Sequence, residues 1–269
     1  MLLSGKTAVI YGAGGSLGGA IAQAFAREGA FVHLTGRNAA SVSQTAEAIR
    51  KAGHQCHTAV VDALDAGAIG RHLEEVGKVD ISFNAIGWED RQDQSLTDMS
   101  VEDFLRPVRR AMETEFLTGT AAARVMMRQG SGVILTLTAT PGGIGYPHVG
   151  GFGPACCAVE SLTRNLASEV GAHGVRVVNI RSGGSPDSKV FREALENGGD
   201  EVKGFLDKLE ADTMLKQMPM MEDIAQAAVF LASDHARKIT GITLDVTCGT
   251  TSALNYMVPR VPFLANQPQ

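Results

Sequence analysis

A glycine-rich stretch near the amino terminus has the spacing of a phosphate-binding turn. The sequence GAGGSLG at 12–18 follows an apolar segment of strand length and precedes a run of small apolar residues typical of a helix. Glycines let a backbone approach a pyrophosphate, and the first N–H groups of a helix carry a partial positive charge. A lone glycine-rich turn also occurs for packing alone. We expect five residues to contact a dinucleotide here: Gly12, Gly14, Ser16, Leu17 and Gly18.

A guanidinium follows the second predicted strand. Arg37 comes after the apolar segment 31–35 and Gly36. NAD-binding turns place an acidic residue at this strand end for the ribose 2′-hydroxyl, and none stands here. Arginine pairs bidentately with phosphate, so the sequence favours NADP(H) over NAD(H). The alternative is an exposed arginine at the start of a helix.

The elements that must position these residues alternate along almost the whole chain. Predicted strands cover 7–11, 31–35, 57–61, 79–84, 132–137, 175–180 and 242–246. Predicted helices cover 17–28, 39–52, 66–76, 100–128 (interrupted at Pro107), 151–173 and 222–233, with Ser100 and Asp103 matching a capping box. This alternation predicts an α/β fold, a Rossmann-type doubly wound parallel sheet of about seven strands with helices on both faces.

Two regions depart from the alternation within what we expect to be a single dinucleotide-binding domain over 1–269. Residues 182–221 form a long insertion with glycine pairs and a mixed helical pattern, and we expect it to be a substrate loop. Residues 250–269 form a proline-containing tail, which we expect to run over the surface or onto a partner subunit.

Composition excludes several classes of function. The formal net charge is −5 and no run of lysine and arginine is present, so we expect no nucleic-acid partner and no membrane-surface binding. No apolar run approaches the ~18 residues of a membrane span, and residues 1–11 lack the basic start and small-residue cleavage site of a signal peptide. The four cysteines lack metal-ligand spacing. We therefore expect a cytoplasmic protein without a metal site.

Further motifs make the chain resemble the short-chain dehydrogenase/reductase family. Asp62 follows the third predicted strand, NAIG at 84–87 ends the fourth, and FLAS at 230–233 lies in the last quarter. The resemblance implies a nicotinamide dinucleotide as ligand, with Asp62 at the adenine and Asn84 and Gly87 at the strand end. It also implies a homodimer or homotetramer formed through the helices around 101–128 and 151–173.

The same resemblance implies catalysis by an Asn, a Ser, a Tyr and a Lys, and this chain lacks all four. The aligned positions hold Phe116, Ala139, Phe152 and Cys156. The family Tyr exchanges the substrate proton and the Lys lowers the pKa of the Tyr. A shift by one residue would offer the hydroxyl of Thr138 or Thr140, but no shift restores the Tyr–Lys pair.

Other side chains could replace the missing Tyr and Lys in proton transfer. His148, with Tyr146 nearby, lies in the loop that faces the nicotinamide in the family, although a loop histidine is more often solvent-facing. Nothing nearby in sequence activates Cys156 as a nucleophile.

Loop residues near the expected pocket leave further alternatives open. Trp88, Glu89 and Asp90 could bind substrate or merely fill a solvated loop. Two positions used by the family near the nicotinamide hold Ser182 and Asp187, and Ser185 or Ser188 could compensate.

The resemblance, together with Arg37, therefore implies an NADP(H)-binding oxidoreductase acting on an apolar carbonyl, alcohol or alkene without the family Tyr/Lys mechanism. The alternative is a non-catalytic dinucleotide-binding pseudoenzyme, or a partner subunit of an active family member.

Overall fold

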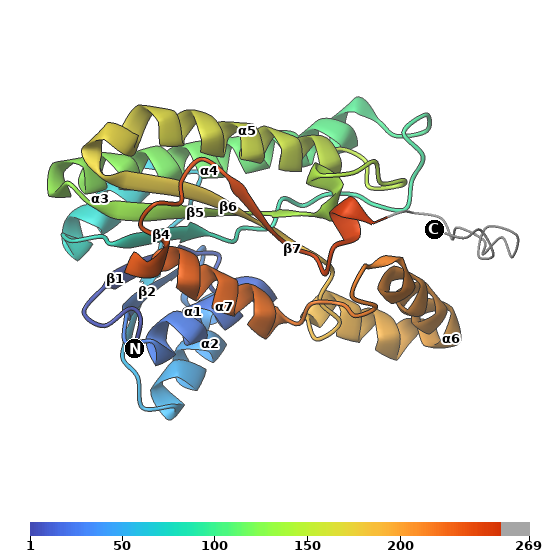
Figure 1. Cartoon of the computed structure of the whole chain (residues 1–269), viewed down its shortest axis with the longest axis horizontal. Coiled ribbons are helices and arrows are strands. Elements are labelled where there is room, and N and C mark those ends of the chain that lie inside the picture. The colour runs from blue at the N-terminus through green and yellow to red at the C-terminus, as the bar shows by residue number, and fades with distance from the viewer. Residues whose placement is uncertain (254–269) are drawn as a thin grey trace, which may run out of the picture.

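Seven parallel strands form one central sheet in the order β3-β2-β1-β4-β5-β6-β7 (Figure 1). The computed structural model describes residues 1–253. The strands are β1 (Thr7–Tyr11), β2 (Phe31–Gly36), β3 (Cys56–Val60), β4 (Ile81–Asn84), β5 (Gly132–Ala139), β6 (Val175–Ser182) and β7 (Thr243–Val246). The inner strands read as continuous apolar runs because helices cover both faces, which confirms the predicted fold class.

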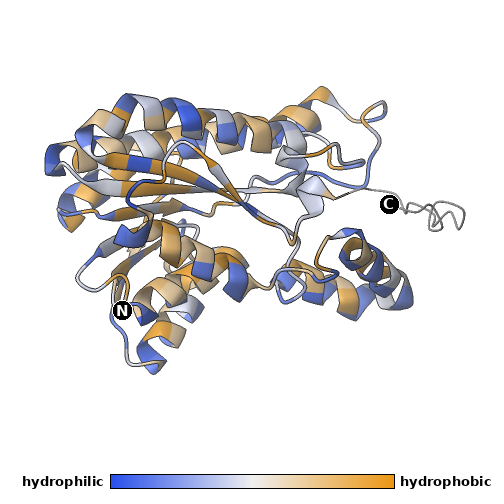
Figure 2. Cartoon of the chain, in the orientation of Figure 1, coloured by the Kyte–Doolittle hydropathy of each residue, from blue (hydrophilic) through white to orange (hydrophobic). Residues whose placement is uncertain are grey.

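Three helices pack on each face of the sheet. α1 (Ser16–Arg27), α2 (Ala39–Lys51) and α7 (Met221–Ala232) cover one face, and α3 (Ala66–Val76), α4 (Val101–Gln129) and α5 (Phe152–Val170) cover the other. Figure 2 shows apolar residues concentrated on the strands and on the helix surfaces next to them. Burial of this apolar surface is the main stabilising term for the fold.

The strand order reverses beside β1, which pairs with β2 on one side and β4 on the other. Tyr11 at the end of β1 lies opposite both Thr35 and Asn84. The chain leaves β1 and β4 toward opposite faces, so their carboxyl ends flank a crevice. The glycine-rich turn therefore lies at the point where α/β proteins bind ligands.

The predicted interruption at Pro107 is wrong, because α4 runs unbroken from Val101 to Gln129. Pro107 removes one backbone hydrogen bond, but it is buried where the start of α5 crosses α4, beside Gly151. The Ser100 hydroxyl accepts from Asp103 N (3.1 Å). The carboxylate of Asp103 accepts from that hydroxyl rather than from the Ser100 backbone, so half of the capping box forms.

The insertion contains one long helix, α6 (Lys189–Asp212), bent at Gly199 where φ is +56°. In Figure 1 this helix stands beyond the carboxyl edge of the sheet. Its start is tied to the glycine-rich turn, because Lys189 N donates to Ser16 Oγ (3.0 Å). Of the predicted tail, Thr250–Ser252 form a short 3-10 helix and residues 254–269 lie outside the described part. Among the described residues, no helix is both long and apolar enough to cross a membrane.

Candidate functional site

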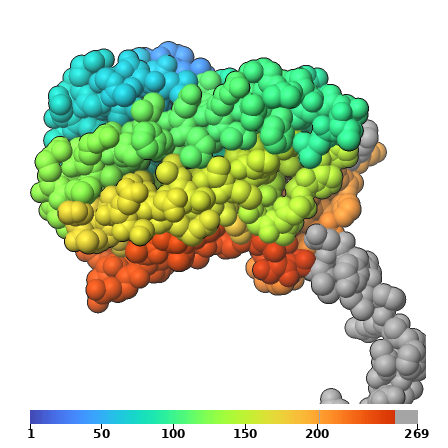
Figure 3. Space-filling view, turned by 90° about the horizontal axis from the view of Figure 1, so that it is seen from above, coloured from blue at the N-terminus to red at the C-terminus, as the bar shows by residue number. Residues whose placement is uncertain are grey.

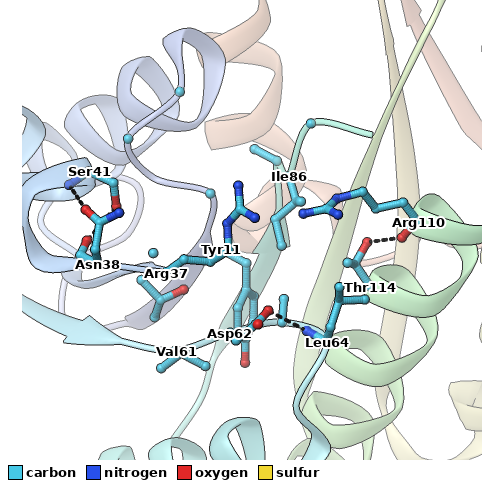
Figure 4. Close-up of a pocket in the computed structure, with 18 of the residues that line it drawn as sticks. Tyr11, Arg37, Asn38, Ser41, Val61, Asp62, Leu64, Ile86, Arg110 and Thr114 are labelled. Carbon is cyan, nitrogen blue, oxygen red and sulfur yellow. Dashed lines mark hydrogen bonds between the residues drawn. The ribbon is translucent and has the colours of Figure 1, made fainter. Parts of the chain in front are cut away.

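The carboxyl ends of β1 to β4 enclose a cavity of about 510 Å³, here called the outer cavity (Figure 4). Five of the residues predicted to bind a dinucleotide line it: Gly12, Gly14, Arg37, Asp62 and Gly87. Figure 4 shows Arg37 and Asp62 on its walls, with Arg110 and Thr114 of α4 opposite Arg37. The structure thus brings together residues from four separate loops.

The glycines of the turn are required by close backbone approaches. Gly12 has φ +74°, and a Cβ there would lie 2.7 Å from the Ala85 carbonyl oxygen. A side chain on Gly14 would collide with the Ser41 carbonyl, and one on Gly18 with the Gly12 carbonyl. Gly15 caps α1 without a side-chain hydrogen bond, which leaves the first N–H groups of that helix for an anion.

A second cavity of about 400 Å³, here called the inner cavity, continues on the far side of the turn. The two cavities share Gly15, Ala85, Ile86 and Gly87. The remaining residues predicted to bind the dinucleotide line the inner cavity: Ser16, Leu17, Gly18 and Asn84. One elongated ligand could therefore extend across the start of α1 from one cavity into the other.

Two of these polar residues also shape the loops. The Asn84 amide donates to Thr118 Oγ1 (3.1 Å) and its carbonyl oxygen accepts from Ile86 N (3.0 Å), which fastens the end of β4 to α4. The Asp62 carboxylate accepts from Leu64 N (3.0 Å), which fixes the turn after β3.

The floor of the inner cavity is apolar where Trp88, Ala139 and Phe152 line it. Trp88, Ala155, Cys156 and Val159 are buried in one cluster with Ala111, and Ala139 and Phe152 pack against it. The Trp88 and Phe152 ring centroids lie 5.4 Å apart.

The structure does not place Phe116 with the other three substituted positions, so the predicted grouping of all four is wrong. The Phe116 side chain is 52% exposed on the outer surface of α4, whereas Ala111 lies in the cluster with Cys156. A helix brings residues three or four apart to one face, so a five-residue shift moves a side chain to another face. Ala111 is therefore the α4 residue that packs with Cys156 in the apolar cluster, and neither residue is among those that line the inner cavity.

Cys156 is fully buried, and this burial is the main reason why its pKa is raised to about 12. The thiol stays protonated at neutral pH. It supplies neither a positive charge nor a thiolate nucleophile.

The nearby hydroxyl groups differ in their availability. The Thr138 hydroxyl donates to Glu160 Oε1 (3.0 Å) and accepts from the Asn179 amide (2.7 Å), so it is held within a buried network. Ser182 Oγ donates to the Thr138 carbonyl (3.2 Å). Ser185 is different, because its hydroxyl is buried without a partner among the described residues and it lines the inner cavity. That hydroxyl is available to hydrogen-bond a ligand in the inner cavity.

Asp90 is the one ionisable side chain among the described residues that line the inner cavity. Gln92 Nε2 donates to Asp90 Oδ2 (2.7 Å), which orients the carboxylate. His148 is exposed, has φ +61° and lines neither cavity. Its participation in catalysis stays a prediction.

A third cavity of about 710 Å³ lies between α6 and the loop after β5. It shares six residues with the inner cavity: Ala139, Phe152, Gly183, Gly184, Val190 and Phe191. Its other walls are mainly apolar: Val149, Val202, Phe205, Leu209 and Met218. The predicted substrate-loop insertion thus provides much of the wall of an apolar chamber beside the inner cavity.

The fold and the two joined cavities define a nucleotide-binding α/β protein, and comparison with known proteins identifies the family. Residues 12–251 match the family described as enoyl-(acyl carrier protein) reductase. An uncharacterised oxidoreductase of Mycobacterium tuberculosis is 32% identical over 256 residues, covering 93% of each chain. The 7α-hydroxysteroid dehydrogenase of Escherichia coli is 29% identical over 258 residues, covering 94% of this chain and 97% of its own.

Solved structures with similar folds come from the same kinds of protein as the sequence relatives. A 7α-hydroxysteroid dehydrogenase in complex with NADH and 7-oxo glycochenodeoxycholic acid has a TM-score of 0.80 at 28% identity, covering 92% of this chain and 94% of its own. A short-chain type dehydrogenase/reductase from Mycobacterium marinum also has a TM-score of 0.80, at 27% identity, covering 93% of this chain and 96% of its own. The chain belongs to the short-chain dehydrogenase/reductase family, a family of oxidoreductases that bind nicotinamide dinucleotides.

Sequence reasoning missed Arg110 of the outer cavity and Ala111 of the apolar cluster. It left open whether Asp90 binds substrate or lies in a solvated loop. Ala111 and Arg110 lie within a 29-residue helix, where only the 3.6-residue period of buried positions could have indicated which side chains face the sheet. Asp90 follows the NAIG segment in an irregular loop, and its direction is set by the loop conformation rather than by any motif.

Proposed function

We propose that the protein is an NADP(H)-dependent oxidoreductase that acts on an apolar alcohol, carbonyl or activated alkene and does not use the family Tyr–Lys pair. The observation that carries this is the pair of joined cavities, with Arg37 in the outer one and an apolar chamber beside the inner one. The bile-acid ligand of the 7α-hydroxysteroid dehydrogenase structure is consistent with a large apolar substrate.

The residues of the chain would divide the work as follows. The start of α1 holds the pyrophosphate, Arg37 pairs with the 2′-phosphate, and the buried Ser185 hydroxyl bonds the carboxamide. When bound, the nicotinamide supplies or accepts the hydride. Asp90 accepts the proton of an alcohol substrate as its hydride leaves, and returns that proton in the reverse reaction. The loop from Trp88 to Asp90 thus replaces chemistry that the apolar floor cannot perform.

Cofactor binding is tested by thermal unfolding with NADPH, NADH or no ligand. A ligand at 100 times its Kd adds about 2.7 kcal/mol to the free energy of unfolding. We expect NADPH to raise the unfolding temperature more than NADH, and Arg37→Met to remove the difference. A protein whose unfolding temperature responds to neither dinucleotide would contradict the proposed function.

The role of Asp90 is tested in a screen of apolar alcohols and ketones by absorbance of the reduced cofactor. We expect Asp90→Asn to lower kcat by about 10²–10⁴-fold while the Kd of NADPH is unchanged. Asp98→Asn, in the following loop, is the control. If His148→Ala lowered kcat and Asp90→Asn did not, the proton-transfer role would belong to His148 instead of Asp90.

The second candidate is a dinucleotide-binding protein without catalytic activity. The apolar cluster of Trp88, Ala111, Phe152 and Cys156 favours it, because no proton donor lies in the floor. Stabilisation by NADPH with no turnover across the substrate screen would select this candidate. Asp90→Asn would then leave every measured property of the complex unchanged.

A further inference from the structure

Two arginines reach into the outer cavity from opposite walls. Arg37 follows β2, and Arg110 lies on α4 (Figure 4). Their guanidinium groups point toward one another in Figure 4. One carboxylate oxygen pairs with both: Glu89 Oε1 is 3.8 Å from Arg37 Nη2 and 3.1 Å from Arg110 Nη2. The two guanidinium nitrogens therefore lie no further apart than the sum of these distances, which is close enough to share one anion.

Arg110 and Glu89 differ in how firmly the surrounding structure holds them. The Arg110 side chain is only 18% exposed, and its Nε is buried without a hydrogen-bond partner among the described residues. Glu89 is 51% exposed and has φ +56°, in the left-handed region that non-glycine residues seldom adopt. Arg110 is thus a partly buried cation with unused donors, and Glu89 is a carboxylate free to move into solvent.

The geometry suits an anion with more oxygens and more charge than a carboxylate. A phosphomonoester carries about −1.5 to −2 charges and three strong acceptor oxygens at neutral pH. It can pair with two guanidinium groups at once, each through parallel N–H···O bonds. A ribose hydroxyl has neither charge nor oxygens enough to displace Glu89. The other acidic residue of this cavity, Asp62, already accepts from Leu64 N beside β3.

We propose that Arg110 is a second arginine for the 2′-phosphate of NADP(H), and that Glu89 is the carboxylate this phosphate displaces. The inference rests on the proposed function and extends it to cofactor selectivity. Glu89 holds the two cations in position while the cavity lacks a phosphate. Glu89 also makes the site selective for NADP(H) over NAD(H). After its carboxylate has been displaced, only a dianionic group such as the 2′-phosphate neutralises the charges of both arginines.

The test measures Kd values for NADPH and NADH by isothermal titration calorimetry. We expect Arg110→Met to weaken NADPH binding by about 10- to 100-fold and to leave NADH binding unchanged. We expect Glu89→Gln to strengthen NADPH binding by about tenfold, since a competing negative charge is removed. Arg109→Met and Glu102→Gln are matched controls, because that ion pair lies on the exposed side of α4. Both should bind NADPH like the wild type.

Two further ligands fix the position of the phosphate. Adenosine 2′,5′-bisphosphate should lose affinity in Arg110→Met, whereas adenosine 3′,5′-bisphosphate should bind weakly to every variant. Equal binding of the two isomers would overturn the 2′-phosphate assignment. So would an Arg110→Met variant that loses NADPH and NADH affinity equally, because Arg110 would then contact the shared adenosine.

The exposed Glu89 keeps the inference testable if Arg110→Met fails to fold. An unchanged or weaker NADPH affinity in Glu89→Gln overturns displacement of the carboxylate. A wild-type protein that binds NADH but not NADPH overturns this inference and leaves dinucleotide binding in place. Binding of neither dinucleotide overturns the proposed function as well.

Discussion

At the scale of single residues, position 156 holds a neutral group in the apolar cluster that packs with Trp88 and Phe152 of the inner cavity. The family resemblance places an ammonium group there, and this chain has a neutral thiol whose pKa burial raises to about 12. Phe152 and Trp88 extend the same apolar surface, with ring centroids 5.4 Å apart. A floor of this kind neither donates a proton nor stabilises a phenolate. The proposed function therefore assigns proton transfer to the wall of the cavity, where Asp90 lies.

Glu115 is a buried group for which the sign of a pH effect can be stated. It lies on α4, is 4% exposed, and burial raises its pKa well above the usual value. Between the unfolded and folded pKa values the folded state binds more protons, so this residue lowers the free energy of unfolding as pH rises. We expect Glu115→Gln to stabilise the protein by about 1 kcal/mol or more at pH 8 and by little at pH 4.

Urea unfolding at both pH values measures this difference. Glu113→Gln, on the exposed side of the same helix, is the control and should change stability equally little at both. A Glu115→Gln effect of the same size at pH 4 and pH 8 would mean that titration of this carboxyl is not its cause.

At the scale of elements, three histidines join β2, β3 and α3. The ring centroid of His33 lies 5.4 Å from that of His57 and 5.7 Å from that of His72. Both ring nitrogens of His72 are buried without a partner among the described residues. Burial first, and then the neighbouring histidines, lower the pKa of His33 to about 4. Burial also lowers the pKa of His72, although Glu75 opposes the shift.

The lowered pKa of His33 in this histidine cluster predicts that the free energy of unfolding decreases as the pH falls. A histidine with a lowered folded pKa is protonated more readily in the unfolded chain, so stability is present above about pH 6.5 and is lost as pH falls toward 4. We expect the free energy of unfolding to fall by about 1 kcal/mol from pH 7 to pH 5 through His33. His33→Gln should reduce that fall in chemical unfolding experiments. An unchanged pH slope in His33→Gln would assign the effect to other groups.

The strands and helices were predictable because their sequence patterns are local. The site was predictable only in part, because some of its side chains are placed by packing between distant segments. Strands buried on both faces and glycine turns are visible in sequence, so all seven strands and the glycine-rich turn between the two cavities follow from it. The direction of a side chain from a long helix depends on packing. Phe116 was therefore placed in the site instead of Ala111, and Arg110 was not recognised. Continuation of α4 through Pro107 likewise depends on its tertiary contact with the start of α5.

At the scale of the whole molecule, α4 and α5 lie side by side on one face (Figure 3). The family resemblance predicts that these helices pair between subunits of a homodimer or homotetramer. Phe116, which lines none of the three cavities described above, is 52% exposed on α4. In a twofold interface the same side chain contributes from both copies, and a buried aromatic residue is a common source of binding energy there. If the predicted assembly forms, we expect Phe116 to lie in that interface.

We expect Phe116→Glu to raise the dissociation constant of the oligomer by more than about tenfold, because two carboxylates would be brought into one apolar contact. Light scattering coupled to size-exclusion chromatography, over a range of protein concentrations, measures the change in mass. Val60→Glu is the control, since this residue is 63% exposed at the end of the edge strand β3. A wild-type protein that is monomeric at every concentration would contradict the prediction. Equal dissociation of both variants would mean that the α4 surface has no special role in assembly.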